Sequence, residues 1–243
     1  NGFYCQSRNF HLQKVGKYEW LFNNYNFSHI AEYLDELVVI NVNPTEKNED
    51  EFLDQVKKIV SKVFIPVAIG GGIRNIEKAK NAFNSGADKV IINSLIRKSA
   101  KKCKNIIENY GSQSVVGSID YKSVNSKNLI FDWESNSIIQ IRDLNSYLEL
   151  CQDIGFGEIL LNSVNRDGTG FGFDLETIKE VASKCKLPLM VMGGAGNINH
   201  FKPTYKINKV DACVTANLLN FIGDALPNVR NELLTEGYDL ARF

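Results

Sequence analysis

The sequence predicts an α/β protein of the TIM (βα)8 barrel class, built from two half-barrel repeats. Three observations predict this fold. Apolar, β-branched runs recur along the 243 residues, a helix-like segment follows nearly every run, and the two halves of the chain resemble each other. Continuous apolar runs are typical of parallel strands that are buried on both faces. Strands that alternate with helices form parallel βα units rather than a sandwich or a helix bundle.

The elements follow one another regularly. Two expected helices begin after Asn75 and Asp174, whose side chains can accept a hydrogen bond from a free N–H of the first turn. The polar stretch 122–137 interrupts the pattern, and we expect a long loop there. The expected strands are 36–42, 66–69, 89–93, 114–119, 158–162, 188–192 and 211–216. The expected helices are 49–63, 76–85, 101–110, 144–154, 175–184 and 225–236.

An internal repeat narrows the architecture. Residues 65–73 read Ile-Pro-Val-Ala-Ile-Gly-Gly-Gly-Ile, and residues 187–195 read Leu-Pro-Leu-Met-Val-Met-Gly-Gly-Ala. Their matching positions are 122 residues apart, and Asp88 and Asp211 are 123 apart. Two copies with about four βα units each predict one eight-unit barrel. We therefore expect residues 1–243 to form a single domain.

The repeat also predicts where the first strand of the barrel lies. Asp120 ends the expected fifth strand, and its repeat mate falls before Asn1. We expect the first strand to precede the given sequence and residues 1–4 to form the turn that leaves it. A barrel without that strand would have two unpaired edges.

The composition excludes several classes of protein. Lys and Arg total 28 and Asp and Glu total 28, so we expect neither nucleic acid nor a membrane surface as a partner. The apolar runs are too short to span a bilayer. Five scattered cysteines without a CxxC spacing fit a reducing cytoplasm, and with only three separated histidines they predict no metal site. No cofactor is expected.

Glycine clusters mark the candidate site. Gly70-Gly71-Gly72 follows the expected strand 66–69, and Gly193-Gly194-Ala-Gly follows the expected strand 188–192. In a parallel barrel, the carboxyl ends of the strands form the functional mouth. Glycine lets backbone N–H groups approach an anion, and a following helix N-terminus favours negative charge. Asn93-Ser94 and Ala216-Asn217 end the neighbouring strands. The pattern predicts two phosphate sites and a ligand with a phosphate at each end.

Two carboxylates at the same mouth are candidates for a chemical role. Asp120 follows an apolar run and can act as a general acid or base between the phosphate sites, or it can cap a turn. Asp167-Gly168 lies in the segment after the expected strand 158–162. Asp167 can contact the ligand, or it can orient its own loop.

Three charged residues open strands at the opposite end. Glu36 and Glu158 are repeat mates, and Lys89 opens another strand. They permit a charged ring that closes the barrel floor, although charged residues at strand starts are commonly just solvated.

These motifs together resemble the HisF family, the cyclase subunit of imidazole glycerol phosphate synthase, over essentially the whole chain. The resemblance is specific because the whole series stands in the family order. The series comprises Gly70-Gly-Gly-Ile-Arg74, Gly86-Ala-Asp-Lys-Val-Ile-Ile-Asn93, Gly111-Ser-Gln-Ser-Val-Val116, Gly157-Glu-Ile-Leu-Leu161, Arg166-Asp-Gly-Thr169 and Gly193-Gly-Ala-Gly196.

The resemblance implies a function and roles for residues. A HisH-like glutaminase docks at the N-terminal face of the barrel, and its ammonia passes through to the mouth. There it reacts with a bis-phosphorylated aminoimidazole-carboxamide ribonucleotide, giving imidazole glycerol phosphate. Asp120 matches one of two catalytic aspartates. Gly71, Gly72, Asn93 and Ser94 match one phosphate site; Asp167, Gly168, Gly193, Gly194, Ala216 and Asn217 match the other; Glu36, Lys89 and Glu158 match the ammonia gate.

The chain also departs from the family pattern at the mouth. Gln6 stands where the family usually has a lysine, Asn41 and Asn165 replace aspartates, Asn162 replaces a threonine, and Met192 replaces a serine. Three hypotheses remain open. The protein is a HisF-type synthase, or a HisF-like relative that conducts ammonia to a partner amidotransferase acting on an acetamido sugar, or a catalytically silent scaffold for the glutaminase.

Overall fold

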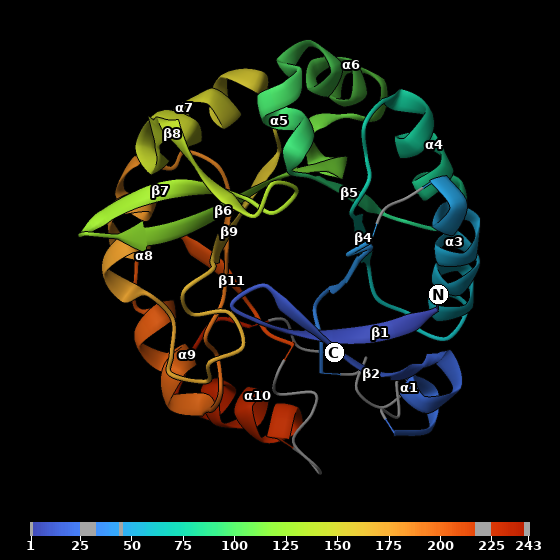
Figure 1. Ribbon diagram of the computed structural model, residues 1–243. Helices are drawn as coiled ribbons and strands as arrows, with labels where there is room; N and C mark the ends of the chain where they lie inside the picture. Colours follow the sequence, from blue (N-terminus) through green and yellow to red (C-terminus); the bar gives the residue numbers. More distant parts are fainter. Residues whose placement is uncertain (1, 25–32, 44–45, 217–224, 241–243) are drawn as a thin grey trace. The chain divides into compact units, whose positions relative to one another are not determined.

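The computed structural model describes the chain except residues 1, 25–32, 44–45, 217–224 and 241–243 (Figure 1). It divides into two compact units. Lys14–Val116 and Asn1–Cys5 belong to the first unit, and Gly117–Leu240 and Gln6–Gln13 belong to the second. The division falls close to the boundary between the two sequence repeats.

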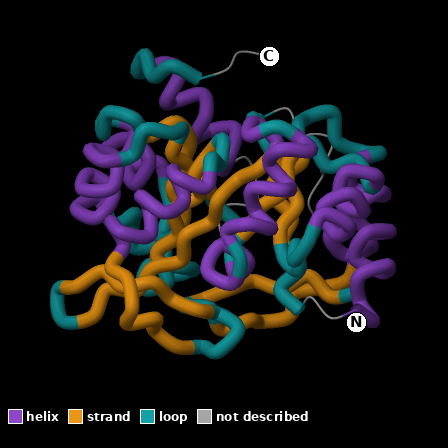
Figure 2. The backbone as a smooth tube through the Cα atoms, turned by 90° about the horizontal axis from the view of Figure 1, so that it is seen from above, coloured by secondary structure: helices purple, strands orange, loops and turns teal. Residues whose placement is uncertain are grey.

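The first unit contains parallel strands in the order β3 (Leu37–Ile40), β4 (Val67–Gly70) and β5 (Lys89–Ile92). Its helices lie along one side of these strands (Figure 1, Figure 2). Core side chains such as Ile59, Ile69 and Ile106 are at most 2% exposed, so the helices and strands are closely packed. The helices are α1 (Tyr18–Asn24), α3 (Glu46–Val60), α4 (Ile76–Asn84), α5 (Ser94–Lys98) and α6 (Ala100–Tyr110), with a 3₁₀ turn at Ser112–Ser114.

The second unit contains parallel strands β9 (Glu158–Ser163), β10 (Leu189–Met192) and β11 (Val210–Val214). An antiparallel set joins them, formed by β6 (Val115–Val124), β7 (Lys127–Asp132) and β8 (Ser137–Asp143). The helices are α7 (Leu144–Ile154), α8 (Leu175–Lys184), α9 (Ile198–Tyr205) and α10 (Ala225–Thr235).

The repeat recurs in the local geometry of both units. β4 and β10 are 122 residues apart, and so are the residues that cap the helices after them, Asn75 and Asn197. Asp88 accepts a hydrogen bond from the Val67 N–H through Oδ2 at 2.8 Å. Asp211 accepts the equivalent bond from the Leu189 N–H at 2.8 Å. The two sequence copies therefore build the same strand, turn and helix.

Most expected elements are confirmed, but the loop predicted at 122–137 is wrong. β6 continues to Val124 and pairs with β7 across a two-residue turn at Asn125 and Ser126, both with positive φ. The polar residues here belong to a partly exposed antiparallel hairpin, which needs apolar side chains on one face only. The stretch was therefore misinterpreted because it lacks a continuous apolar run.

The N-terminal segment also differs from expectation. The turn predicted at 1–4 is wrong, since Phe3–Arg8 forms β1 and pairs with β2 (His11–Lys17) across Asn9 and Phe10. Both turn residues have positive φ, as the tight turns of two-residue hairpins require. The short helices α5 and α9 were not predicted either.

The carboxylate that holds β4 gives a first prediction. Asp88→Ala leaves the Val67 N–H without its partner, and Val67 is 1% exposed. We expect the free energy of unfolding to fall by about 1–3 kcal/mol, measured by urea denaturation. Asp153→Ala on the exposed face of α7 is the control, with an expected change within about 0.5 kcal/mol. Equal effects of the two variants would contradict this assignment.

Candidate functional site

The first glycine pair forms a tight turn at the carboxyl end of β4. Gly71 and Gly72 have φ values of +87° and +82°. A Cβ at Gly71 would lie 2.1 Å from the Asn41 carbonyl oxygen, so this position accepts only glycine. The chain then enters α4, whose N-cap Asn75 accepts a hydrogen bond from the Lys78 N–H. The turn brings bare backbone close to a helix N-terminus, as an anion site requires.

Asn93 and Ser94 lie at the end of the neighbouring strand, β5. Asn93 is the N-cap residue of α5 but makes no capping hydrogen bond with its side chain. The Ser94 Oγ atom is buried and has no hydrogen-bond partner among the described residues. A buried hydroxyl without a partner is costly, and an anion can accept its hydrogen bond.

The second glycine pair repeats this geometry in the second unit. Gly193 and Gly194 have φ values of +104° and +101°. A Cβ at Gly193 would lie 2.8 Å from the Ser163 carbonyl oxygen, and Ser163 is the repeat mate of Asn41. Ala216 is exposed just after β11. Asn217 lies outside the described residues.

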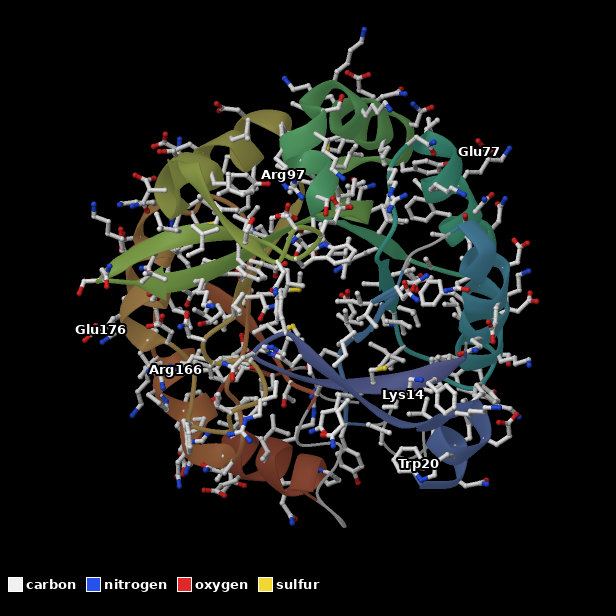
Figure 3. All side chains as sticks on the ribbon, viewed as in Figure 1. Lys14, Trp20, Glu77, Arg97, Arg166 and Glu176 are labelled. Atoms are coloured by element: carbon white, nitrogen blue, oxygen red, sulfur yellow. The ribbon has the colours of Figure 1, made fainter. Side chains whose placement is uncertain are left out.

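Two further residues adjoin this second turn, and the sequence analysis gave them no role. Arg166 is on the loop that leaves β9 (Figure 3). If Gly194 carried a Cβ atom, this atom would lie 3.1 Å from the Cβ of Arg166. The His200 Nδ1 atom accepts a hydrogen bond from the Gly196 N–H at 3.0 Å. Burial lowers the pKa of His200, which keeps the ring neutral and able to accept this bond. Only the folded turn brings these side chains beside the glycines.

Asp167 holds the N-terminal hairpin. Its Oδ2 atom accepts hydrogen bonds from the Ser7 hydroxyl at 2.6 Å and from the Phe10 N–H at 3.0 Å. A Cβ on Gly168 would lie 2.1 Å from the Ser7 carbonyl oxygen, so the hairpin packs directly on this loop. Asp167 was expected either to contact the ligand or to orient its own loop, and these contacts favour the second role. No sequence signal pointed to Ser7 or Phe10.

Asp120 lies within β6 rather than at its end. It is 7% exposed, and its Oδ1 atom accepts a hydrogen bond at 3.1 Å from Nδ2 of Asn162 on β9. The next residue, Tyr121, points the other way and donates to Asp174 Oδ2 at the N-terminus of α8, at 2.9 Å. Because side chains alternate along a strand, Asp120 lies on the face opposite α8.

The tyrosine on the helix side fixes this strand. Burial and the charge of Asp174 raise the pKa of Tyr121, so its hydroxyl stays protonated and donates. Asp174 also accepts a hydrogen bond from the Thr177 hydroxyl at 2.8 Å, and Thr177 accepts one from the Asn128 amide at 3.0 Å. This network ties β6 and β7 to α8 and so helps to hold Asp120 in place.

The charged residues at the strand starts lie in different units. The Lys89 Nζ atom lies 2.7 Å from Glu36 Oε2, and the side chains are 20% and 19% exposed. Glu158 begins β9 in the second unit. The pair of Glu36 and Lys89 is thus formed within the first unit, and a ring of all three residues stays a prediction.

The described residues form neither a metal-binding cluster nor a membrane-spanning helix. Within the described part of the chain, no three His, Cys, Asp or Glu side chains are grouped so that they could hold a metal ion. Among the helices that the structure describes, none has both the length and the apolar character needed to cross a bilayer.

Comparison with known proteins identifies the family. The histidine biosynthesis protein family matches residues 23–223. A protein of Parasynechococcus marenigrum assigned as imidazole glycerol phosphate synthase subunit hisF2 is 36% identical over 233 residues, covering 96% of this chain and 86% of that relative. This chain belongs to the HisF family. The HisF subunit of Chlorobium phaeobacteroides (strain BS1) is 33% identical and that of Clostridium botulinum 34%, each over 86% of this chain and 83% of the relative.

The family match confirms the predicted fold class. Both units contain parallel strands with flanking helices, as expected for an α/β barrel family. The HisF departures noted above have structural partners in this chain. The Asn41 Oδ1 atom accepts a hydrogen bond from the Asn43 N–H at 3.0 Å. Asn165 accepts from the Ser123 N–H at 2.8 Å and donates to the Ser123 carbonyl at 3.4 Å. An aspartate at 165 could not make the second bond, so the amide clamps the β6–β7 hairpin.

The glycine turn gives a prediction with a matched control. Gly71→Ala combines a positive φ with an overlap against the Asn41 backbone, and we expect a loss of about 3 kcal/mol or more of unfolding free energy. Gly155→Ala shares a positive φ but has nothing within 4 Å, so about 1–2 kcal/mol is expected. Urea denaturation of both variants measures the difference. If Gly71→Ala were as stable as Gly155→Ala, the turn would have to move away from the Asn41 backbone to accept the Cβ, and the close contact assigned here would be contradicted.

Proposed function

We propose that this HisF family member is the cyclase subunit of an imidazole glycerol phosphate synthase. It uses ammonia from a HisH-like glutaminase to convert a bis-phosphorylated aminoimidazole-carboxamide ribonucleotide to imidazole glycerol phosphate and aminoimidazole carboxamide ribotide, in the cytoplasm. The observation that supports this most is Asp120, a carboxylate that is 7% exposed on the helix-free face of β6. The chain keeps this group together with both glycine turns.

The proposed chemistry is general acid–base catalysis by Asp120 on a ligand that carries two phosphates. The turns at Gly71-Gly72 and Gly193-Gly194 each hold one phosphate through backbone N–H groups, and Ser94 adds a hydroxyl donor to the first. Asp120 then takes and returns a proton at the reacting centre. The Asn162 amide donates a hydrogen bond to Asp120 Oδ1 at 3.1 Å and helps to hold this carboxylate in place.

The ammonia route starts at the other end of the strands. Glu36 and Lys89 form an ion pair where β3 and β5 begin, and we assign this pair and Glu158 to the gate that ammonia passes. Phe64 lies three residues before β4, at the same end of these strands, and is 98% exposed. A large exposed aromatic side chain is typical of a protein interface. We therefore assign Phe64 to the surface where the glutaminase docks.

A second candidate is a HisF-like relative that passes ammonia to another enzyme, an amidotransferase for an acetamido sugar. The similarity to the hisF2 protein and the use of Asn41 and Asn165 in local structure support it. Turnover of the ribonucleotide with ammonium salts separates the candidates. A folded chain that docks glutaminase but gives no turnover would favour the second candidate or a silent scaffold.

Removing the proposed acid–base group tests the first candidate. We expect Asp120→Asn to lower kcat by about 10²–10⁴ with ammonium chloride as the nitrogen source, because the amide cannot exchange the proton. Docking of the glutaminase is expected to stay unchanged. Asp153→Asn, on an exposed helix surface, serves as the control. Unaltered turnover by Asp120→Asn would remove this residue from the mechanism.

The docking surface can be tested separately from the chemistry. We expect Phe64→Asp to weaken glutaminase binding by roughly 30-fold or more, the effect of losing an interface hot spot, while ammonium-dependent turnover is kept. Phe171→Asp is the matched control, since Phe171 is 75% exposed but follows the carboxyl end of β9. Titration calorimetry measures both affinities. Equal affinities for the two variants would place docking elsewhere.

A further inference from the structure

Asn162 presents a buried acceptor that no described residue of the chain uses. The side chain is 6% exposed, and its Nδ2 atom donates to Asp120. A carboxylate only accepts hydrogen bonds, so the amide nitrogen must face Asp120 and the carbonyl oxygen must point elsewhere. The Asn162 Oδ1 atom is buried and has no hydrogen-bond partner among the described residues. A buried acceptor without a donor is destabilising and needs an explanation.

The surroundings of this oxygen indicate where a donor would come from. On β10, Met192 is in register with Asn162, and its side chain has no N–H or O–H group to offer. Beyond it lies Gly193, where a Cβ would be 3.4 Å from Asn162 Oδ1. The unused acceptor therefore adjoins the second glycine turn, on the face of the strands that carries Asp120.

We propose that Asn162 Oδ1 accepts a hydrogen bond from a hydroxyl group of a phosphate ester whose phosphate binds at Gly193 and Gly194. The inference rests on the phosphate site in the proposed function and adds a specificity-determining residue to it. A polyol phosphate carries hydroxyl groups close to its phosphate, so one ligand reaches both groups. Because the same amide bonds Asp120, ligand binding and the placement of the carboxylate are coupled.

A site built around a hydroxyl discriminates against analogues that lack it, because the buried acceptor then stays unpaired. The test compares sn-glycerol 3-phosphate with propyl phosphate, which has no hydroxyl groups. Binding to the full chain is followed by the NMR amide signals of Gly193 and Gly194. We expect the wild-type protein to bind the glycerol ester about tenfold more tightly, as one hydrogen bond allows.

We expect Asn162→Leu to remove this preference by weakening only the glycerol ester, and Asn162→Ala to do the same if leucine does not fit. An unchanged affinity for propyl phosphate shows that the variant is folded and that its glycine turn is intact. Met192→Leu is the matched control and keeps the preference, since it alters the neighbouring side chain without touching the acceptor.

The outcomes separate this inference from the function on which it rests. A wild-type protein that binds both esters equally, or an Asn162→Leu variant that keeps the preference, would overturn the inference alone. Absence of binding of either ester at these glycines would overturn both the phosphate site and the inference. The positioning effect has its own readout, because loss of the Asn162 donor is expected to lower kcat with ammonium chloride while propyl phosphate binding stays unchanged.

Discussion

Close backbone contact at the carboxyl ends of the strands is the constraint on which the candidate site depends. Gly71 lies against the Asn41 carbonyl, and Gly193 lies against the Ser163 carbonyl. Neither contact leaves room for a Cβ, and all four residues of the two pairs have positive φ. The chain therefore turns sharply and enters a helix capped by asparagine. The same constraint acts once in each unit.

Strand β6 shows how the proposed acid–base group is positioned by hydrogen bonds on the opposite face of the strand. Asp120 and Tyr121 point to opposite sides, the first toward Asn162 and the second toward the N-terminus of α8. The bonds of Tyr121, Asp174 and Thr177 fix the backbone from the helix side. The carboxylate is thereby held beside Asn162, whose amide nitrogen serves Asp120 and whose oxygen is the acceptor assigned to a ligand hydroxyl.

Polar residues that follow the carboxyl ends of the strands have structural roles in this chain. Asp167 accepts two hydrogen bonds from the N-terminal hairpin, and Asn165 clamps the β6–β7 hairpin with both ends of its amide. These contacts explain how the chain tolerates asparagine where its family usually has aspartate. Asparagine at positions 41 and 165 leaves fewer negative charges to hold a charged intermediate. The replacement of aspartate by asparagine is compatible with the family reaction and also with a different ligand.

The sequence by itself determined the periodic features of this protein. Parallel strands, most helices, the repeat and the glycine turns were predicted, because buried strands and tight turns restrict residue types locally. Only the tertiary structure decided which polar atoms meet. The contacts of Asp167 with Ser7 and of Asp120 with Asn162 join residues 160 and 42 positions apart. The hairpin at 122–137 was missed for a related reason, since its strands are stabilised by pairing and not by a continuous apolar run. Hydrogen bonds between distant side chains leave no periodic trace in a sequence, so the use of each acceptor had to be observed in the fold.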